Sequence, residues 1–592
     1  MQQPITILLK RLWHHISLRR RKQFLAMIGL TVFSSLAEVV SLGAVLPFIG
    51  ILTQPEKVFA SPWLTSFVRS LGITSAGELV LPLTIGFAVA ALVAGALRLL
   101  LLWVSIRLGN ATGADLSIEI YRRTLYQAYS AHIARSSSEI ISGITQKVGT
   151  ASSILLSLAV AITSTVLFIA ILTTLLVVDP MVAILAATSF GAAYGVIGYY
   201  ARGRLVNNSH CITQEQTRVV KALQEGLGAI RDILLDGTQK VYSNLYSDAI
   251  LQLQRAGGEN TFINQAPRYV MEALGMALIA VFVLILSHRA GGVATALPIL
   301  SMLALGAQRL LPLMQQLYGN WSVVLGGHAA LADVLALLDQ PLPKQSSLLE
   351  PEPLVMGRSI QFKDVRFQYN SNSPWVLDEV NLTISKGTRV GIIGSTGSGK
   401  STVLDLLMGL LQPTRGNILV DGKLITADDN RAWQRSISHV PQSIYLADTS
   451  IAENIAFGVP CNEIDIALVR KAAQQARIAD FIEGRPEGYS AVVGERGVRL
   501  SGGQRQRIGI ARALYKKATV LIFDEATSAL DGETEQEVMD AIEGLSKSLT
   551  LFIVAHRTST LRNCDVIIKL VDGKFIVDSN RSAISENEKS TN

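Results

Sequence analysis

The sequence predicts a multidomain membrane protein, in which a six-helix α transmembrane domain is followed by an α/β P-loop nucleotide-binding domain. The first observation is composition: hydrophobic residues make up 49% of the 592 residues and charged residues only 17%. Such a chain is too apolar for a soluble protein of this size. The second is distribution, because nearly all long apolar runs lie in the first half of the chain. The third is a glycine-rich segment in the second half, set between an apolar run and a helical pattern.

Six apolar runs are long enough to cross a bilayer, which takes about 20 apolar residues. They cover about residues 24–51, 80–106, 155–178, 182–200, 270–286 and 293–317. Asp179 and Pro180 suit a tight turn between the third and fourth runs.

Cations set the expected orientation. A basic cluster precedes the first run and consists of Lys10, Arg11, Arg19, Arg20, Arg21 and Lys22. The expected outer loops hold few cations, chiefly Lys57, Arg69 and Arg289, whereas the expected inner loops hold many. Since cytoplasmic flanks carry the excess of Lys and Arg, both termini are expected in the cytoplasm. Nucleic acid is the alternative partner for such a cluster, but a membrane flank fits better and no nucleic acid is expected.

The loops have patterns of their own. The inner loops, residues 110–153 and 201–265, are polar and helix-patterned, so the helices are expected to continue beyond the bilayer. Their tips, near 131–138 and 238–246, are placed to touch the soluble domain, although plain solvated hairpins are the alternative. The outer segment 61–72 predicts a short amphipathic helix at the membrane interface.

The expected domains are a transmembrane domain at 1–335, a proline-containing linker at 336–359 and a nucleotide-binding domain at 360–580. The polar residues 581–592 are expected to be a disordered tail. Cys211, Cys461 and Cys564 have neither metal-site nor disulfide spacing. No cleavable signal peptide is expected.

The glycine-rich segment has the spacing of a phosphate-binding P-loop between a strand at 390–393 and a helix at 403–411. The expected nucleotide-binding residues are Gly394, Ser395, Thr396, Gly397, Ser398, Gly399, Lys400, Ser401 and Thr402. Glycines let backbone N–H groups turn toward a polyphosphate, and the following helix N-terminus favours its negative charge. Lys400 can reach the outer phosphates of ATP, and the Ser401 hydroxyl suits Mg²⁺. An ordinary glycine-rich turn is the alternative, and the motifs downstream disfavour it.

Two acids end the apolar run 518–523. A carboxylate at the end of a buried strand can hold the Mg²⁺ shell, which is the role expected for Asp524. Its neighbour Glu525 is placed to polarise a water for attack on the γ-phosphate.

A second anion cradle lies upstream. Ser501, Gly502, Gly503 and Gln504 open a predicted helix and suit a phosphate. One nucleotide on a monomer does not need two cradles. Two copies facing head to tail would complete each other's sites.

In this setting residues 500–504 resemble the signature motif of ATP-binding cassette proteins, and the resemblance spans the chain in the order of an exporter half-transporter. It implies that Tyr369 stacks on adenine and that Gln442 senses Mg²⁺ and touches the membrane domain. It also implies a γ-phosphate contact for His556, an interface role for residues 528–531 and a loop facing the coupling helices at Glu495. A homodimer suffices for two competent sites, and a heterodimer is the alternative.

The cargo depends on the membrane half. Arg98, Arg268 and Arg309 fall in or at the inner half of the predicted spans. Buried cations face a cavity or a partner, so these arginines predict a basic substrate cavity suited to pyrophosphate. The alternative is pairing with Glu38 or Glu272.

Residues 37–43 through 54–56, together with 224–232, resemble the lipid-linked oligosaccharide flippases of the PglK type. This resemblance implies a cargo with a polyprenyl or similar tail, a pyrophosphate and a glycan, flipped across a bacterial cytoplasmic membrane. The rival hypothesis is an exporter of peptides, lipids or drugs. A soluble cassette ATPase acting on DNA or ribosomes conflicts with six predicted spans.

Overall fold

The computed structural model describes residues 3–53, 78–178, 180–287, 310–342, 351–525, 532–555 and 561–578. The chain divides into two compact units. The first comprises residues 1–127 and 134–342, and the second comprises 128–133 and 343–592. Of the expected tip of the first inner loop, near 131–138, residues 131–133 fall in the second unit and residues 134–138 in the first.

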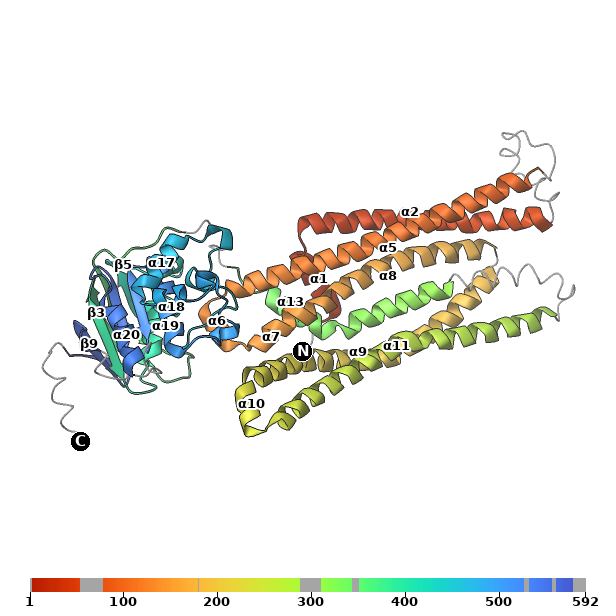
Figure 1. The fold of residues 1–592 in the computed structure, drawn as a ribbon. Coiled ribbons are helices and arrows are strands. Elements are labelled where there is room, and N and C mark those ends of the chain that lie inside the picture. The colour runs from red at the N-terminus through yellow and green to blue at the C-terminus, as the bar shows by residue number, and fades with distance from the viewer. Residues whose placement is uncertain are drawn as a thin grey trace. The chain divides into compact units, whose positions relative to one another are not determined.

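The first unit is helical (Figure 1). Its elements are α1 (Ile5–His15), α2 (Leu18–Thr53), α5 (Val80–Leu125), α7 (Ser137–Ser142), the π-helical segment η1 (Gly143–Lys147), α8 (Val148–Val178), α9 (Pro180–Gly228), α10 (Ile230–Asp236), α11 (Gln239–Ser287), a helix over Leu310–Gly326 and α13 (His328–Leu338). The short helix α6 (Tyr129–Ala134) falls largely in the second unit.

Three of the described helical segments are long and apolar enough to span a membrane: Leu18–Ser41, Val80–Leu125 and Ser137–Thr173. The pair Leu310–Gly326 and His328–Leu338, bent by 54°, makes a fourth if it is one span. As predicted, α5 and α9 continue well past their apolar runs, to Leu125 and Gly228. The sixth predicted span lies partly outside the described residues, and the predicted amphipathic segment 61–72 lies wholly outside them.

The long helices form two groups (Figure 1). α2, α5 and α8 pack against one another, whereas α9 packs chiefly along α11. Where α1 and α13 join the first group, a core forms around Leu8, Leu12, Ile154 and Leu335, all nearly inaccessible to solvent. This core fixes the ends of α5, α8 and α13 relative to one another.

The second unit is an α/β domain with two sheets. The larger sheet has the order β10-β9-β3-β8-β7-β6 and is parallel except for β10. Its strands are β3 (Arg389–Gly394), β6 (Ile437–Val440), β7 (Val520–Asp524), β8 (Thr550–Val554), β9 (Val566–Val571) and β10 (Lys574–Asp578). The antiparallel sheet has the order β2-β1-β4-β5, with β1 (Ser359–Phe367), β2 (Leu377–Ser385), β4 (Arg415–Val420) and β5 (Lys423–Leu424).

Helices cover this framework (Figure 1). They are α14 (Lys400–Leu407), α15 (Asn430–Arg435), α16 (Ile451–Ile455), α17 (Ile466–Gln475), α18 (Ala479–Glu483), α19 (Gly502–Tyr515) and α20 (Gly532–Glu543), with short 3₁₀ turns at Cys461–Glu463, Gly488–Ser490 and Glu495–Gly497. One hydrophobic core joins α14, the antiparallel sheet and β3, and a second joins α16, α17, α19 and α20. α14, which follows the glycine-rich loop, therefore packs in one core, and α19 packs in the other.

Two expected boundaries need correction. The helix expected at 403–411 begins at Lys400 and ends at Leu407. It begins early because Gly399, the last glycine of the loop, is the N-cap of the helix. The expected linker 336–359 is too long at both ends. α13 extends to Leu338, and Met356 is fully buried in the core of the second unit.

Candidate nucleotide site and membrane cavities

The glycine-rich loop connects the carboxyl end of β3 to the first turn of α14. β3 forms because Val390 and Ile392 are buried between β8 and β9 in the parallel sheet. Gly397 and Gly399 have φ values of 83° and 102°, a left-handed region that favours glycine. Gly399 serves as the N-cap of α14, so the N-terminal N–H groups of this helix lie next to the loop.

Inside the loop, Lys400 is almost fully buried. Its Nζ donates to the carbonyl oxygens of Gly394 and Ser395, at 2.8 Å and 3.2 Å. The Ser398 hydroxyl is buried without a hydrogen-bond partner, and a Cβ added to Gly394 would lie 2.6 Å from it. A lysine curled inside the loop and an unsatisfied hydroxyl beside it fit a cradle for phosphate oxygens.

Asp524 ends β7, which lies between β6 and β8, and Glu525 follows the strand directly. Gln442 follows β6, and its Nε2 donates to Oε2 of Glu525 at 2.9 Å. Glu525 has φ 49°, and its N–H donates to the Val554 carbonyl at the end of β8. A non-glycine residue held in the left-handed region is strained, and such strain clusters at functional sites. The carboxyl ends of β3, β8, β7 and β6 therefore bring the loop, the acids and Gln442 to one edge of the sheet.

Burial controls the acids at this edge. It raises the pKa of Asp524, as does the neighbouring Glu525, while Lys400 lowers it. Burial, together with Asp524, raises the pKa of Asp405 on α14 to about 6. Asp405 was not expected from the sequence. An acid inside an otherwise apolar helical run, five residues after the P-loop lysine, was the available signal.

These oxygens suit a hard cation. Ser401, Gln442 and Asp524 would hold Mg²⁺ through a hydroxyl, an amide and a carboxylate oxygen, the donor types that Mg²⁺ prefers. Within the described ranges no three His, Cys, Asp or Glu side chains cluster as a metal cage. Mg²⁺ usually completes its coordination with water and substrate phosphates.

Tyr369 lies two residues after β1, and its ring is half exposed. Its hydroxyl is 3.1 Å from Oγ1 of Thr402 in the first turn of α14, and Phe367 packs edge-on against it at 5.0 Å. The aromatic ring expected to stack on adenine is thus tethered to the helix that follows the phosphate loop.

The predicted second cradle is the start of α19. Ser501 is its N-cap, and a capping box joins it to Gln504 in both directions. α19 packs in the core that it shares with α16 and α17, whereas α14 packs in the other core. His556, residues 528–531 and Arg309 lie outside the described residues.

Comparison with known proteins agrees with this geometry. Residues 377–528 match the family model described as ABC transporter. A solved bacterial Atm1-family ABC exporter with ATP bound aligns with a TM-score of 0.71 over 94% of each chain, at 24% sequence identity. The chain has the fold of an ABC exporter half-transporter.

Curated relatives match over shorter stretches. An ATP-dependent lipid A-core flippase of Saccharophagus degradans is 34% identical over 396 residues, 66% of this chain and 65% of the relative. A flippase with the same description from Cupriavidus metallidurans is 40% identical over 42% of each chain. A beta-(1→2)glucan export ATP-binding/permease protein of Rhizobium meliloti is 39% identical over 46% of each chain. The chain thus spans between about two fifths and two thirds of the length of these relatives.

The helical first unit, residues 1–127 and 134–342, is called the membrane unit below. In it, both described arginines of the expected basic cavity have acidic partners. Nη2 of Arg98 lies 3.2 Å from Oε1 of the buried Glu38, and Nε of Arg268 lies 2.8 Å from Oε1 of Glu272. The alternative raised from the sequence, pairing with these acids, is therefore what the structure shows. The side chains of both arginines remain 55% exposed, so pairing leaves their other donors accessible.

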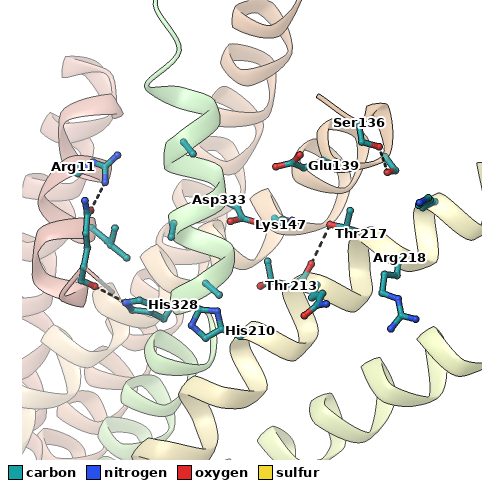
Figure 2. Close-up of a pocket in the computed structure, with 18 residues that line it drawn as sticks. Arg11, Ser136, Glu139, Lys147, His210, Thr213, Thr217, Arg218, His328 and Asp333 are labelled. Atoms are coloured by element: carbon teal, nitrogen blue, oxygen red, sulfur yellow. Dashed lines mark hydrogen bonds and ion pairs between the residues drawn. The ribbon is translucent and has the colours of Figure 1, made fainter. Parts of the chain in front are cut away.

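A polar cavity of about 770 Å³ lies between α1, α7, η1, α9 and α13 (Figure 2). Lys147, at the end of η1, is 2% exposed and its Nζ lies 2.6 Å from Oδ2 of Asp333 on α13. Arg218 on α9 pairs with the buried Glu215 at 2.9 Å. Lys147 and Arg218 are thus both paired with acids inside the chain. Sequence inspection missed the Lys147–Asp333 pair, since 186 residues separate its members.

Proposed function

We propose that this chain is an ATP hydrolase coupled to transmembrane transport. It works as a homodimer in a bacterial cytoplasmic membrane, with both termini in the cytoplasm, and flips a lipid-linked pyrophosphate oligosaccharide from the inner to the outer leaflet. The alternative is an exporter of lipids, peptides or drugs with the same fold.

The observation that carries the ATPase proposal is the edge of the parallel sheet. There Lys400 lies in the glycine loop, Asp524 ends β7, and Glu525 accepts a hydrogen bond from Gln442. Bound Mg²⁺ would neutralise charge on the β- and γ-phosphates. Glu525 would orient and deprotonate the attacking water, and Gln442 fixes the carboxylate that does so.

Transport follows if ATP binds one arrangement of the dimer better than another. Only a difference in affinity between two states shifts their equilibrium. Ser501 and its neighbours at the start of α19 would complete the site of a second copy, so that ATP holds the two domains together. Hydrolysis through Glu525 then releases them.

Two observations support a glycolipid cargo. The relatives named above include lipid A-core flippases and a glucan exporter, so both a lipid and a saccharide lie within the range of related cargoes. Arg98 and Arg268 lie in long helices and keep accessible donors, which suits a pyrophosphate. The proposal includes two further residues. His556 contacts the γ-phosphate of ATP, and Arg309 is the third cation of the substrate cavity.

The test reconstitutes the full chain in lipid discs and measures ATPase stimulation and flipping. A pyrophosphate-linked glycolipid is compared with peptides and dyes. We expect the glycolipid alone to stimulate turnover and to be translocated. Stimulation by peptides or dyes with no response to glycolipid would replace the proposed cargo by the alternative.

The arginine pairs need a charge-balanced control. Replacing Arg98, Arg268 and Arg309 by alanine should abolish glycolipid flipping and leave basal ATPase activity. The double variant Arg98→Gln with Glu38→Gln removes one pair without leaving a buried charge, and it should still weaken flipping. If that double variant flips normally, Arg98 serves only to neutralise Glu38.

A further inference from the structure

An aromatic cavity of about 500 Å³, whose lining does not include the paired arginines Arg98 and Arg268, lies in the membrane unit between α8, α9 and the helix Leu310–Gly326. It is lined by Phe168, Tyr194, Gly195, Gly198, Tyr199, Arg202, Met314, Leu317, Tyr318 and Trp321. Its volume lies within the range of small-molecule sites, about 300–1,000 Å³. Five aromatic rings from three helices thus border one space.

Three of the rings form a continuous wall. The ring centroids of Tyr194 and Tyr318 are 5.5 Å apart, and those of Tyr318 and Trp321 are 5.6 Å apart. Gly198 faces Trp321, because a Cβ added there would lie 3.6 Å from the indole, and a Cβ at Gly195 would meet nothing within 4 Å. The two glycines therefore leave room in front of the rings.

This wall also carries polar groups. The hydroxyls of Tyr194 and Tyr318 are buried and have no hydrogen-bond partner. A buried hydroxyl without a partner is destabilising, so phenylalanine would pack better at either position if packing were the only requirement. The cavity thus combines apolar ring faces with hydroxyl groups.

Arg202 supplies the charge. It lies on the α9 face shared by Gly195, Gly198 and Tyr199, since residues three and four apart line one side of a helix. Its side chain is exposed, and among the described residues it has no ion-pair partner. Nearby Arg204, in contrast, lies 3.7 Å from Glu259.

We propose that this aromatic cavity binds a glycosyl phosphate: the sugar ring next to the phosphate packs against Tyr318 and Trp321, and the guanidinium of Arg202 binds the phosphate. The assignment rests on the proposed function for its ligand class, a phosphate-linked saccharide. A sugar has apolar C–H faces that pack on aromatic rings and hydroxyls that partner the phenols. An acyl or polyprenyl tail would fill the space but leave Arg202 and both hydroxyls unpaired. Arginine is the side chain whose geometry matches a phosphate.

The experiment measures equilibrium binding to the full chain in lipid discs without nucleotide. The probes are geranyl pyrophosphate closed by a methyl ester on its terminal phosphate and geranyl pyrophosphate carrying N-acetylglucosamine there, so that both have the same charge and differ in the sugar. We expect the sugar to raise affinity by up to about tenfold, from the ring-packing energies typical of aromatic pairs. Tyr199→Leu and Trp321→Leu should each reduce that increment, and Tyr318→Phe should reduce it without lowering thermal stability.

Charge variants test the second half of the site. Arg202→Ala should weaken binding of both probes, and Arg202→Lys should restore part of the loss. The matched controls are Tyr200→Leu, an exposed aromatic outside the lining, and Arg204→Ala, and both should bind like the unchanged chain. If Trp321→Leu fails to fold, Tyr199→Leu still tests the site. Tyr199 is 81% exposed, so we expect its replacement to leave the fold intact.

Two results separate this inference from the proposed function. If the unchanged chain flips glycolipid but the sugar increment survives Tyr199→Leu, Trp321→Leu and Tyr318→Phe, the aromatic site is wrong and the flippase proposal stands. If the chain flips no glycolipid but the sugar increment is present and depends on these rings, the site stands and the cargo proposal fails. Equal affinity for the two probes overturns the site.

Discussion

At the residue scale, Glu525 is held at the end of β7 by its strained backbone and by the hydrogen bond from Gln442. We expect Glu525→Gln to keep ATP binding, because the phosphate loop is untouched. ATPase activity should fall by about 100- to 10,000-fold, the range typical of a lost general base. Nucleotide binding and steady-state hydrolysis, measured on the same preparation, check this. Hydrolysis at the unchanged rate would assign the base to another residue.

Asp405 gives a prediction about pH. Burial and Asp524 raise its pKa to about 6, above the ordinary value of 3.8. The folded state therefore binds the proton more tightly than the unfolded state does, and stability falls as pH rises from about 4 through 6. Above that window the ionised, buried carboxylate destabilises the folded state, whereas the side chain of Asn carries no charge.

We expect Asp405→Asn to raise the Tm of the nucleotide-free chain at pH 7.5 and to change it little at pH 4.5. Thermal unfolding at both pH values measures the difference. Asp448→Asn, at an exposed carboxylate of the same domain, is the control for the removal of one negative charge. Equal effects of Asp405→Asn at both pH values would contradict the raised pKa.

At the element scale, α19 and α16 begin in the same way. Ser501 with Gln504 and Ser450 with Glu453 both form capping boxes. Removing either cap should cost about 1 kcal/mol of stability. Only Ser501→Ala should also weaken ATP-dependent dimerisation, because the start of α19 is the proposed second cradle. Comparable dimerisation by Ser501→Ala and Ser450→Ala would leave Ser501 a purely structural cap.

The same elements mark how far sequence inspection reaches. The strand and the loop before Lys400 were predictable because glycine spacing and burial pattern are local features, whereas the helix that follows begins three residues earlier than expected. The linker was expected too long because Met356 is buried by a tertiary contact that no local pattern reveals. The partners of Arg98 and Lys147 lie 60 and 186 residues away, so only the folded chain shows which cations are neutralised. The aromatic cavity was missed for the same reason, since its rings come from three separate helices.

At the scale of the whole molecule, the glycine loop and the start of α19 rest on different cores of one domain. If each half-site is completed by a second copy, two different inactive chains should complement each other. Lys400→Ala removes the phosphate lysine and Ser501→Arg blocks the second cradle, so each homodimer has two damaged sites. A mixed dimer has one site with both defects and one site with none.

We therefore expect each variant alone to lack ATPase activity and the co-expressed, doubly tagged mixture to regain it in the mixed dimers. Mixing Lys400→Ala with Glu525→Gln is the control. Both residues belong to the same half-site, so each of the two nucleotide sites in the mixed dimer still carries one defect. Activity in the first mixture and none in the second requires a head-to-tail pair. Inactivity of both mixtures, with confirmed mixed dimers, would contradict the prediction that one intact site, formed by the loop of one copy and the start of α19 of the other, is enough for hydrolysis.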